Sequence, residues 1–147
     1  MILTGNEIKK QVKMGNINIL PFVDEHVNPN SYNFCLGATY KEKYCGNNGQ
    51  NTYSDLLTIP SEGLLLQPKI IYLSSTVESI CSQQYIVSLI GRSSVGRLGL
   101  FVQISTDPCN FGINNNRIIE LACVQPIRVY SEMIIGQAIF WKTEGTS

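Results

Sequence analysis

One segment organises the rest of this sequence: Gly91-Arg92-Ser93-Ser94-Val95-Gly96-Arg97-Leu98-Gly99-Leu100, which meets the short apolar runs 86–90 and 98–104. If Ser93 or Ser94 opens a helical turn, the first backbone N–H groups of that turn have no partner within it and can bind an anion. Arg92 can then hold an oxyanion through two parallel hydrogen bonds. Ser93 and Arg97, four residues apart, share one face of such a turn. The alternative is a capped turn with solvated arginines, and composition alone favours neither.

Short apolar runs separated by Pro, Gly, Asn and Ser continue on both sides of this segment from Ile17 onward. Runs of this length with turn residues between them are typical of a mostly-β domain. Because the connections are short and there is almost no helix, we expect a jelly roll or a distorted barrel. The predicted strands are Asn18–Leu20, Ser31–Leu36, Gly63–Gln67, Ile70–Ser74, Ile86–Ile90, Leu98–Ile104, Arg117–Cys123, Ile127–Tyr130 and Ile134–Trp141.

The N-terminal residues predict one short helix. Thr4 and Glu7 form a capping-box pattern, Ile8 and Val12 lie four residues apart, and Gly15 is a natural stop. The Asn- and Gly-rich segment 45–51 tolerates left-handed backbone, so it predicts a surface loop.

Length and composition limit the classes of protein. We expect a single domain over residues 1–147. Eleven basic residues balance eleven acidic ones, so we expect no nucleic-acid partner, although a nucleotide needs only a local cluster of arginine and N–H groups. There is no export signal and no apolar stretch long enough for a membrane span, which predicts a cytoplasmic protein without membrane contact. Five cysteines without a C-x-x-C pair argue against disulfides and a Cys-rich zinc site.

Glu120 stands in the otherwise apolar run 117–124, which is apolar enough for a buried strand. Burial raises the pKa of a carboxyl group toward the range in which it accepts a proton from water and returns it. The alternative is that strand alternation turns Glu120 to solvent or pairs it with an arginine. His26 is the only histidine, so a His-dependent triad or a multi-histidine metal site is excluded unless a second residue type substitutes. Zinc-dependent nucleobase deaminases carry H-x-E and P-C-x-x-C, which this sequence lacks, so deamination here would be zinc-free.

These residues resemble the dCTP deaminase family, and the likeness runs from Met1 to about Gly145. The segment 91–100 matches the family's G-R-S-S-x-x-R-L-G-L. Residues 28–33 resemble the N-P-N-S-Y-N element of the short Gram-positive and phage branch, and residues 120–130 resemble that branch's strand with the catalytic glutamate. The resemblance implies a dUTPase-like distorted jelly roll with a helical turn near Ser93–Arg97.

By position, the resemblance also implies roles for individual residues. Glu120 activates the water that attacks C4 of cytosine, while Ser93 and Arg97 orient that water and stabilise the tetrahedral intermediate. Family members are homotrimers with active sites at subunit interfaces. Their Mg²⁺ ion is bound by the triphosphate of the nucleotide and not by protein ligands. The nucleotide-binding residues implied are Arg92, Ser94, Val95, Gly96, Thr106, Asn110, Ile118 and Ile119.

The sequence departs from the family pattern in three places. Residues 103–112 replace a stretch that reads close to H-V-T-A, and Asn110 stands where the family has an Asp of the sugar and nucleobase pocket. Asn114-Asn115-Asn116 replace Gly and bulky apolar residues. The family's C-terminal segment, which folds over the nucleotide, has no counterpart before Ser147, so we expect no lid.

Three hypotheses follow for function. The leading one is hydrolytic deamination of dCTP, or of a modified dCTP, to dUTP and ammonia. The second is a dUTP diphosphatase or a bifunctional deaminase and diphosphatase, which needs acidic ligands for Mg²⁺ where Asn33 and Asn110 stand. The third is a catalytically inactive nucleotide-binding or protein-interaction module, because a fold does not determine function.

Overall fold

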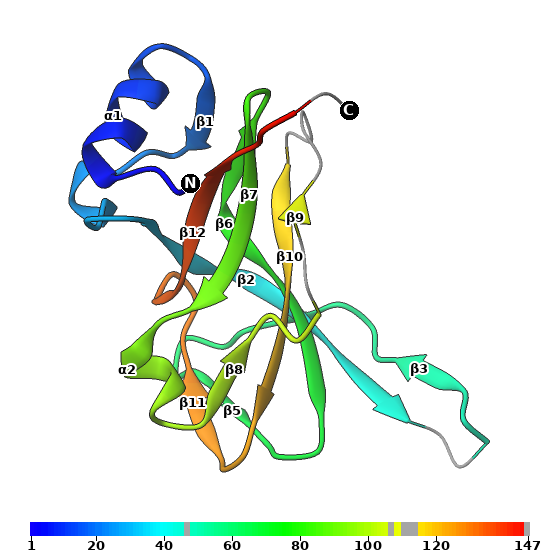
Figure 1. The fold of residues 1–147 in the computed structure, drawn as a ribbon. Helices are drawn as coiled ribbons and strands as arrows, with labels where there is room; N and C mark the ends of the chain where they lie inside the picture. The colour runs from blue at the N-terminus through cyan, green and yellow to red at the C-terminus, as the bar shows by residue number, and fades with distance from the viewer. Residues whose placement is uncertain (46–47, 106–107, 110–114, 146–147) are drawn as a thin grey trace.

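Strands dominate the computed structural model, which describes residues 1–45, 48–105, 108–109 and 115–145 (Figure 1). No helix among these residues has the length and apolar character needed to span a membrane. The elements in chain order are α1 (Gly5–Lys13), β1 (Ile17–Leu20), the 3₁₀ helix η1 (Asp24–His26), β2 (Tyr32–Cys45), β3 (Asn51–Tyr53), β4 (Leu57–Thr58), β5 (Leu64–Leu66), β6 (Ile71–Ser82), β7 (Tyr85–Gly91), α2 (Ser93–Gly96), β8 (Leu100–Val102), β9 (Pro108–Cys109), β10 (Asn116–Cys123), β11 (Ile127–Val129) and β12 (Ile134–Lys142).

Ten strands of the described chain form one hydrogen-bonded sheet whose path runs β8-β10-β6-β2-β12-β7-β9. β1 adds to β6, β3 and β4 add to β2, and β5 pairs separately with β11. Leu100 and Val102 on β8, at one end of this path, and Val87 and Leu89 on β7, near the other end, are buried in the same core as Phe34 and Phe140, so the sheet closes around its own apolar face. This confirms the mostly-β, distorted jelly-roll prediction.

The helix α1 confirms the N-terminal prediction. Thr4 is the N-cap, and its hydroxyl oxygen accepts a hydrogen bond from the Glu7 N–H at 3.3 Å, which satisfies one of the free donors of the first turn. Ile8 is fully buried. The chain leaves the helix through Gly15, whose φ of +80° favours glycine.

The predicted strands 31–36 and 70–74 were too short. β2 continues to Cys45, and its last residues form a ribbon with β3, where Lys43 pairs with Tyr53. β6 continues to Ser82 and points polar side chains inward. Ser74 Oγ donates to Thr39 O at 2.6 Å, and Thr76 Oγ1 donates to Glu78 O at 2.6 Å. Apolar runs do not predict these extensions, because they contain inward polar side chains whose hydroxyl groups are satisfied by backbone carbonyls.

The Asn28–Asn33 element is a hydrogen-bonded turn that leads into β2. Asn28 Nδ2 donates to Ser31 Oγ at 3.1 Å and to Asn33 Oδ1 at 2.6 Å. Ser31 Oγ in turn donates to Gln137 Oε1 on β12 at 2.5 Å. Tyr32, in the same element, is completely buried, and burial raises the pKa of its phenol to about 12. This motif therefore anchors the N-terminal segment to the sheet.

Candidate active site

Glu120 lies on β10 between β6 and β8, where it pairs with Leu73, and the next residue, Leu121, pairs with Val102. The burial of β10 alternates: Ile119 and Leu121 point into the core, whereas Glu120 is half-buried on the opposite face with the exposed Ile118. The expectation that an apolar environment encloses Glu120 is therefore wrong for the single chain, because the strand period of two turns this side chain outward.

Ser105 and Gln103, which follow β8, hold Glu120 in place. Its carboxylate accepts hydrogen bonds from the Ser105 N–H at 3.1 Å and from Ser105 Oγ at 2.7 Å. Gln103 Oε1 accepts from the Glu120 N–H at 3.3 Å, and Gln103 N donates to Glu120 O at 2.8 Å. Gln103 adopts a φ of 73°, which is uncommon for a residue with a Cβ and bends the chain as β8 ends.

Sequence reasoning named residues 103–105 only as part of a departure from the family pattern, and did not assign Gln103 or Ser105 a role. The alignment with H-V-T-A was the available signal that this segment belongs to the site. The contact with Glu120 depends on the pairing of β8 with β10, which local spacing does not reveal.

The helical turn expected near Ser93–Arg97 is present as α2, and its N-cap is Arg92. The Arg92 carbonyl accepts hydrogen bonds from the Val95 N–H at 3.1 Å and from the Gly96 N–H at 2.8 Å. The side chain of Val95 is buried in the core. The N–H groups of Val95 and Gly96 are thus used within the turn, whereas Ser93 and Ser94 supply its first two N–H groups.

Several polar side chains of this turn are also accessible to a ligand. Ser93, Ser94 and Arg97 are exposed, and Arg92 is half-buried. Neither arginine forms an ion pair with any residue that the structure describes. Two guanidinium groups without such partners, beside two hydroxyls, suit a multiply charged anion.

Within one chain, Glu120 and α2 lie at opposite ends of β8. Gln103, just after β8, contacts Glu120, whereas α2 precedes Leu100, so three strand residues or about 10 Å separate the two ends. The described contacts include none between Glu120 and Ser93 or Arg97. A hollow of about 470 Å³ is nevertheless lined both by Gly91, next to Arg92, and by Gln103 and Ser105.

The remaining predicted residues differ in their accessibility. Thr106 and Asn110 lie outside the described residues. Ile118 is 67% exposed beside Glu120, whereas the side chain of Ile119 is fully buried, so only its backbone could reach a ligand. Asn116, one of the residues that depart from the family pattern, donates through Nδ2 to Thr76 O at 2.9 Å and to Val77 O at 2.8 Å.

Groups of His, Cys, Asp and Glu side chains that could hold a metal ion do not form around Glu120 in the described part of the chain. The group of such residues found there consists of His26, Cys35 and Glu78 on other elements. Cys123 lies at the end of the Glu120 strand, but burial raises the pKa of its thiol, so it stays protonated. The carboxylate is thus the one group of this strand suited to move a proton to and from water.

Comparisons with known proteins give the family of this chain. A family model described as dCTP deaminase-like matches residues 2–143. A protein named "dCTP deaminase, dUMP-forming" from Hathewaya histolytica is 40% identical over 148 residues, which cover 99% of this chain and 85% of that protein. A protein of the same name from Cytophaga hutchinsonii is 42% identical over 149 residues, with 99% and 84% covered.

The fold has a solved counterpart in the 2'-deoxycytidine 5'-triphosphate deaminase from Agrobacterium tumefaciens, with a TM-score of 0.73 at 19% identity. The match covers 95% of this chain and 47% of that chain, so the present chain spans about half the length of that protein. Since the family model matches nearly all of its residues and relatives of about 40% identity align over its whole length, this chain belongs to the dCTP deaminase-like family.

Proposed function

We propose that this chain hydrolytically deaminates dCTP and releases dUMP. The observation that carries the proposal is the Glu120 carboxylate, which Ser105 holds at the edge of a hollow that is also lined by the residue before Arg92. The names of the relatives support dCTP as the substrate. They differ from the sequence-based expectation in the product, which is dUMP in those names and not dUTP.

The chemistry requires one carboxylate to move protons. Glu120 takes a proton from water as the water oxygen forms a bond to C4 of cytosine. It delivers this proton to the ring nitrogen. It then takes the proton of the new C4 hydroxyl and gives it to the amino group, so that the C4–N bond breaks, the C4 carbonyl forms and ammonia leaves. Release of dUMP requires a second water to cleave the bond between the α- and β-phosphates, with diphosphate as the leaving group.

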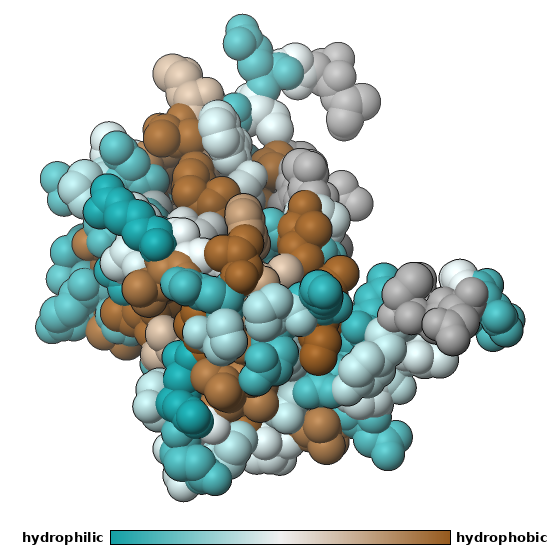
Figure 2. Space-filling model, turned by 90° about the horizontal axis from the view of Figure 1, so that it is seen from below, coloured by the Kyte–Doolittle hydropathy of each residue, from teal (hydrophilic) through white to brown (hydrophobic). Residues whose placement is uncertain are grey.

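The exposed groups of α2 complete the proposed site. Arg92 and Ser94 bind phosphate, and Ser93 and Arg97 orient the attacking water and stabilise the intermediate. Because Glu120 and α2 lie at opposite ends of β8, we assign the two halves of one site to neighbouring copies in a homotrimer. The end of the molecule with α2 and β8 supports this assembly, since Leu98 and Phe101 are 54% and 58% exposed, and Figure 2 shows apolar surface among polar residues on this side.

A mixing experiment tests the shared site. The variants Glu120→Gln and Arg97→Ala should each be inactive, but trimers reassembled from both should recover activity, because some interfaces then combine an intact Glu120 with an intact Arg97. Light scattering should report three copies. A monomeric particle with full activity, or a mixture that remains inactive although the copies exchange, would contradict the arrangement.

Magnesium enters the proposal only with the substrate. Of the described acidic side chains, none forms a metal-ligating group with the residues of α2 or with Glu120, so the phosphate oxygens would hold the ion. Bound Mg²⁺ would neutralise part of the triphosphate charge. Removal of Mg²⁺ should therefore weaken dCTP binding, whereas a zinc chelator should leave the deamination rate of folded protein unchanged. The proposal places this reaction in the cytoplasm, within a domain formed by residues 1–147.

Product analysis decides between the hypotheses. Purified protein is incubated with dCTP, and separately with dUTP, while ammonia and diphosphate are measured and the nucleotides are separated by chromatography. Ammonia with dUMP from dCTP is the expected result. Accumulation of dUTP would limit the activity to deamination, and turnover of dUTP alone would indicate a diphosphatase. Binding of dCTP without ammonia would indicate an inactive binding module.

A further inference from the structure

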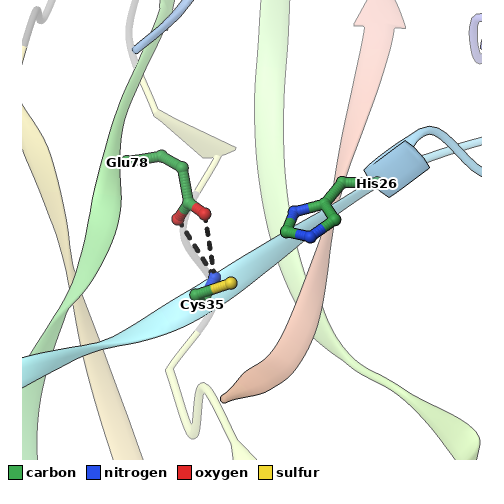
Figure 3. A group of neighbouring side chains, drawn as sticks. All are labelled: His26, Cys35 and Glu78. Atoms are coloured by element: carbon green, nitrogen blue, oxygen red, sulfur yellow. Dashed lines mark hydrogen bonds between the residues drawn. The ribbon is translucent and has the colours of Figure 1, made fainter. Parts of the chain in front are cut away.

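A second polar cluster lies in the core, away from Glu120. It consists of His26 on η1, Cys35 on β2 and Glu78 on β6, whose ligand atoms all lie within 4.8 Å of one another. Figure 3 shows the Cys35 sulfur and the His26 ring turned toward the space beside the Glu78 carboxylate. Glu78 is 3% exposed and Cys35 is 7% exposed, so the cluster is built into the fold.

In this cluster one buried carboxylate lacks a countercharge, and one buried imidazole nitrogen lacks a hydrogen-bond partner. The Glu78 carboxylate accepts the Cys35 N–H at 3.0 and 3.2 Å, but the described residues give it no ion pair. A buried anion without a countercharge is unfavourable. His26 Nδ1 is also buried, and it has no hydrogen-bond partner among the described residues. A single cation between the three side chains would satisfy both groups.

We propose that His26, Cys35 and Glu78 form a binding site for Zn²⁺ or a chemically similar divalent ion. Imidazole nitrogen, thiolate sulfur and carboxylate oxygen are the donors that zinc takes, whereas Mg²⁺ and Ca²⁺ prefer oxygen alone. Three protein donors leave a fourth position for water. The Cys35 thiol releases its proton to solvent as the metal–sulfur bond forms.

Only a small movement of the three side chains is needed to bring their ligand atoms to zinc-binding distance. Zinc–ligand bonds of about 2.0–2.3 Å place tetrahedral ligand atoms about 3.5 Å apart, so the cluster must contract by about 1 Å from its present spread. His26 can supply this movement, because it is half-exposed on the single turn of η1. The Cys35 N–H already orients the carboxylate, and the Tyr32 ring, with its centroid 5.9 Å from that of His26, flanks the imidazole.

This site is separate from the proposed chemistry. Glu78 lies five residues along β6 from Leu73, the partner of Glu120, which is about 16 Å of strand. Glu78 also points into the core, whereas Glu120 points outward. The ion would therefore fasten η1 to β2 and β6 and stabilise the fold, without contact to the reacting atoms.

The test uses the full chain, made metal-free and then titrated with Zn²⁺ alone. We expect one ion per chain by mass spectrometry, and a rise in Tm that saturates at one equivalent. Co²⁺ in place of Zn²⁺ should give a sulfur-to-cobalt charge-transfer band. His26→Phe keeps a ring but removes the nitrogen donors, and Cys35→Ser removes the sulfur. Each should weaken metal binding by more than about 100-fold, since even residues that only support a ligand cost 10–100-fold.

The matched control is Cys123→Ser, which removes a different buried thiol and should leave zinc affinity and the cobalt band unchanged. His26→Phe should also keep the Tm of the metal-free protein, because its Nδ1 has no described partner, so the test does not depend on the folding of the cysteine variant. Failure to bind zinc stoichiometrically, or wild-type affinity in His26→Phe and Cys35→Ser, would overturn the proposal. Neither outcome bears on dCTP turnover, which the ammonia assay measures independently.

Discussion

Replacement of Glu120 by Gln tests the proposed base. The substitution exchanges one carboxylate oxygen for an NH₂ group while Ser105 still offers two donors, from Oγ at 2.7 Å and from N at 3.1 Å. The amide can accept only one of these, so the loss in folding stability is that of one hydrogen bond, about 1 kcal/mol. No cavity forms, and for a chain of this length Tm should fall by about 2–4 °C.

The effect on catalysis should be much larger than the effect on stability. The amide cannot take a proton from water, so ammonia release should fall by roughly two to four orders of magnitude, the usual contribution of general acid–base catalysis. This corresponds to about 3–5 kcal/mol in the barrier. The measurement is the rate of ammonia release at saturating dCTP in a coupled assay, with Tm recorded on the same preparation.

Binding provides the control for this experiment. Calorimetric titration should show that Glu120→Gln keeps its affinity for dCTP, because in the proposed site α2 holds the phosphates and the carboxylate does not, whereas Arg92→Ala should lose affinity. Deamination by Glu120→Gln at the wild-type rate would refute the assignment of the base. Equal losses of affinity in both variants would show that Glu120 holds the substrate instead.

Three further predictions concern neighbouring residues and stability. Ser105→Ala keeps the N–H donor to Glu120 but removes the hydroxyl, so kcat should fall about tenfold with KM unchanged; steady-state kinetics would contradict a positioning role if only KM rose. Gly136→Ala places a Cβ 2.4 Å from the Phe34 ring, which should lower the free energy of unfolding by about 1–3 kcal/mol in a urea titration. Burial raises the pKa of Tyr32 from 10.0 to about 12, so the folded state holds the phenol proton more tightly than the unfolded chain does. The resulting stabilisation of the folded state is complete below pH 10 and is lost as the pH rises toward 12, by about 3 kcal/mol in total. Urea midpoints between pH 9 and 12 should fall more steeply for wild type than for Tyr32→Phe, and parallel curves would refute this.

Local and contiguous features were predictable from the chain alone. Thr4 and Glu7 cap α1 through a hydrogen bond across three residues, and Gly15 ends the turn that follows, so neighbouring residue types suffice to predict this helix. The segment 91–100 likewise carries its helical turn and its arginines within one stretch. Such features depend on φ/ψ preferences and on donors a few residues apart, which the sequence lists in order.

Contacts between distant segments depend on strand register, which only the tertiary structure provides. Glu120 turns outward because β10 pairs with β6 and β8 in one particular register, and the same pairing brings Ser105 to its carboxylate. His26, Cys35 and Glu78 meet for the same reason, although 52 residues separate the first from the last. A shift of one residue in the register of a strand would turn each of its side chains to the opposite face of the sheet. Apolar runs therefore predicted that these strands exist, whereas strand pairing and packing determined which side chains meet.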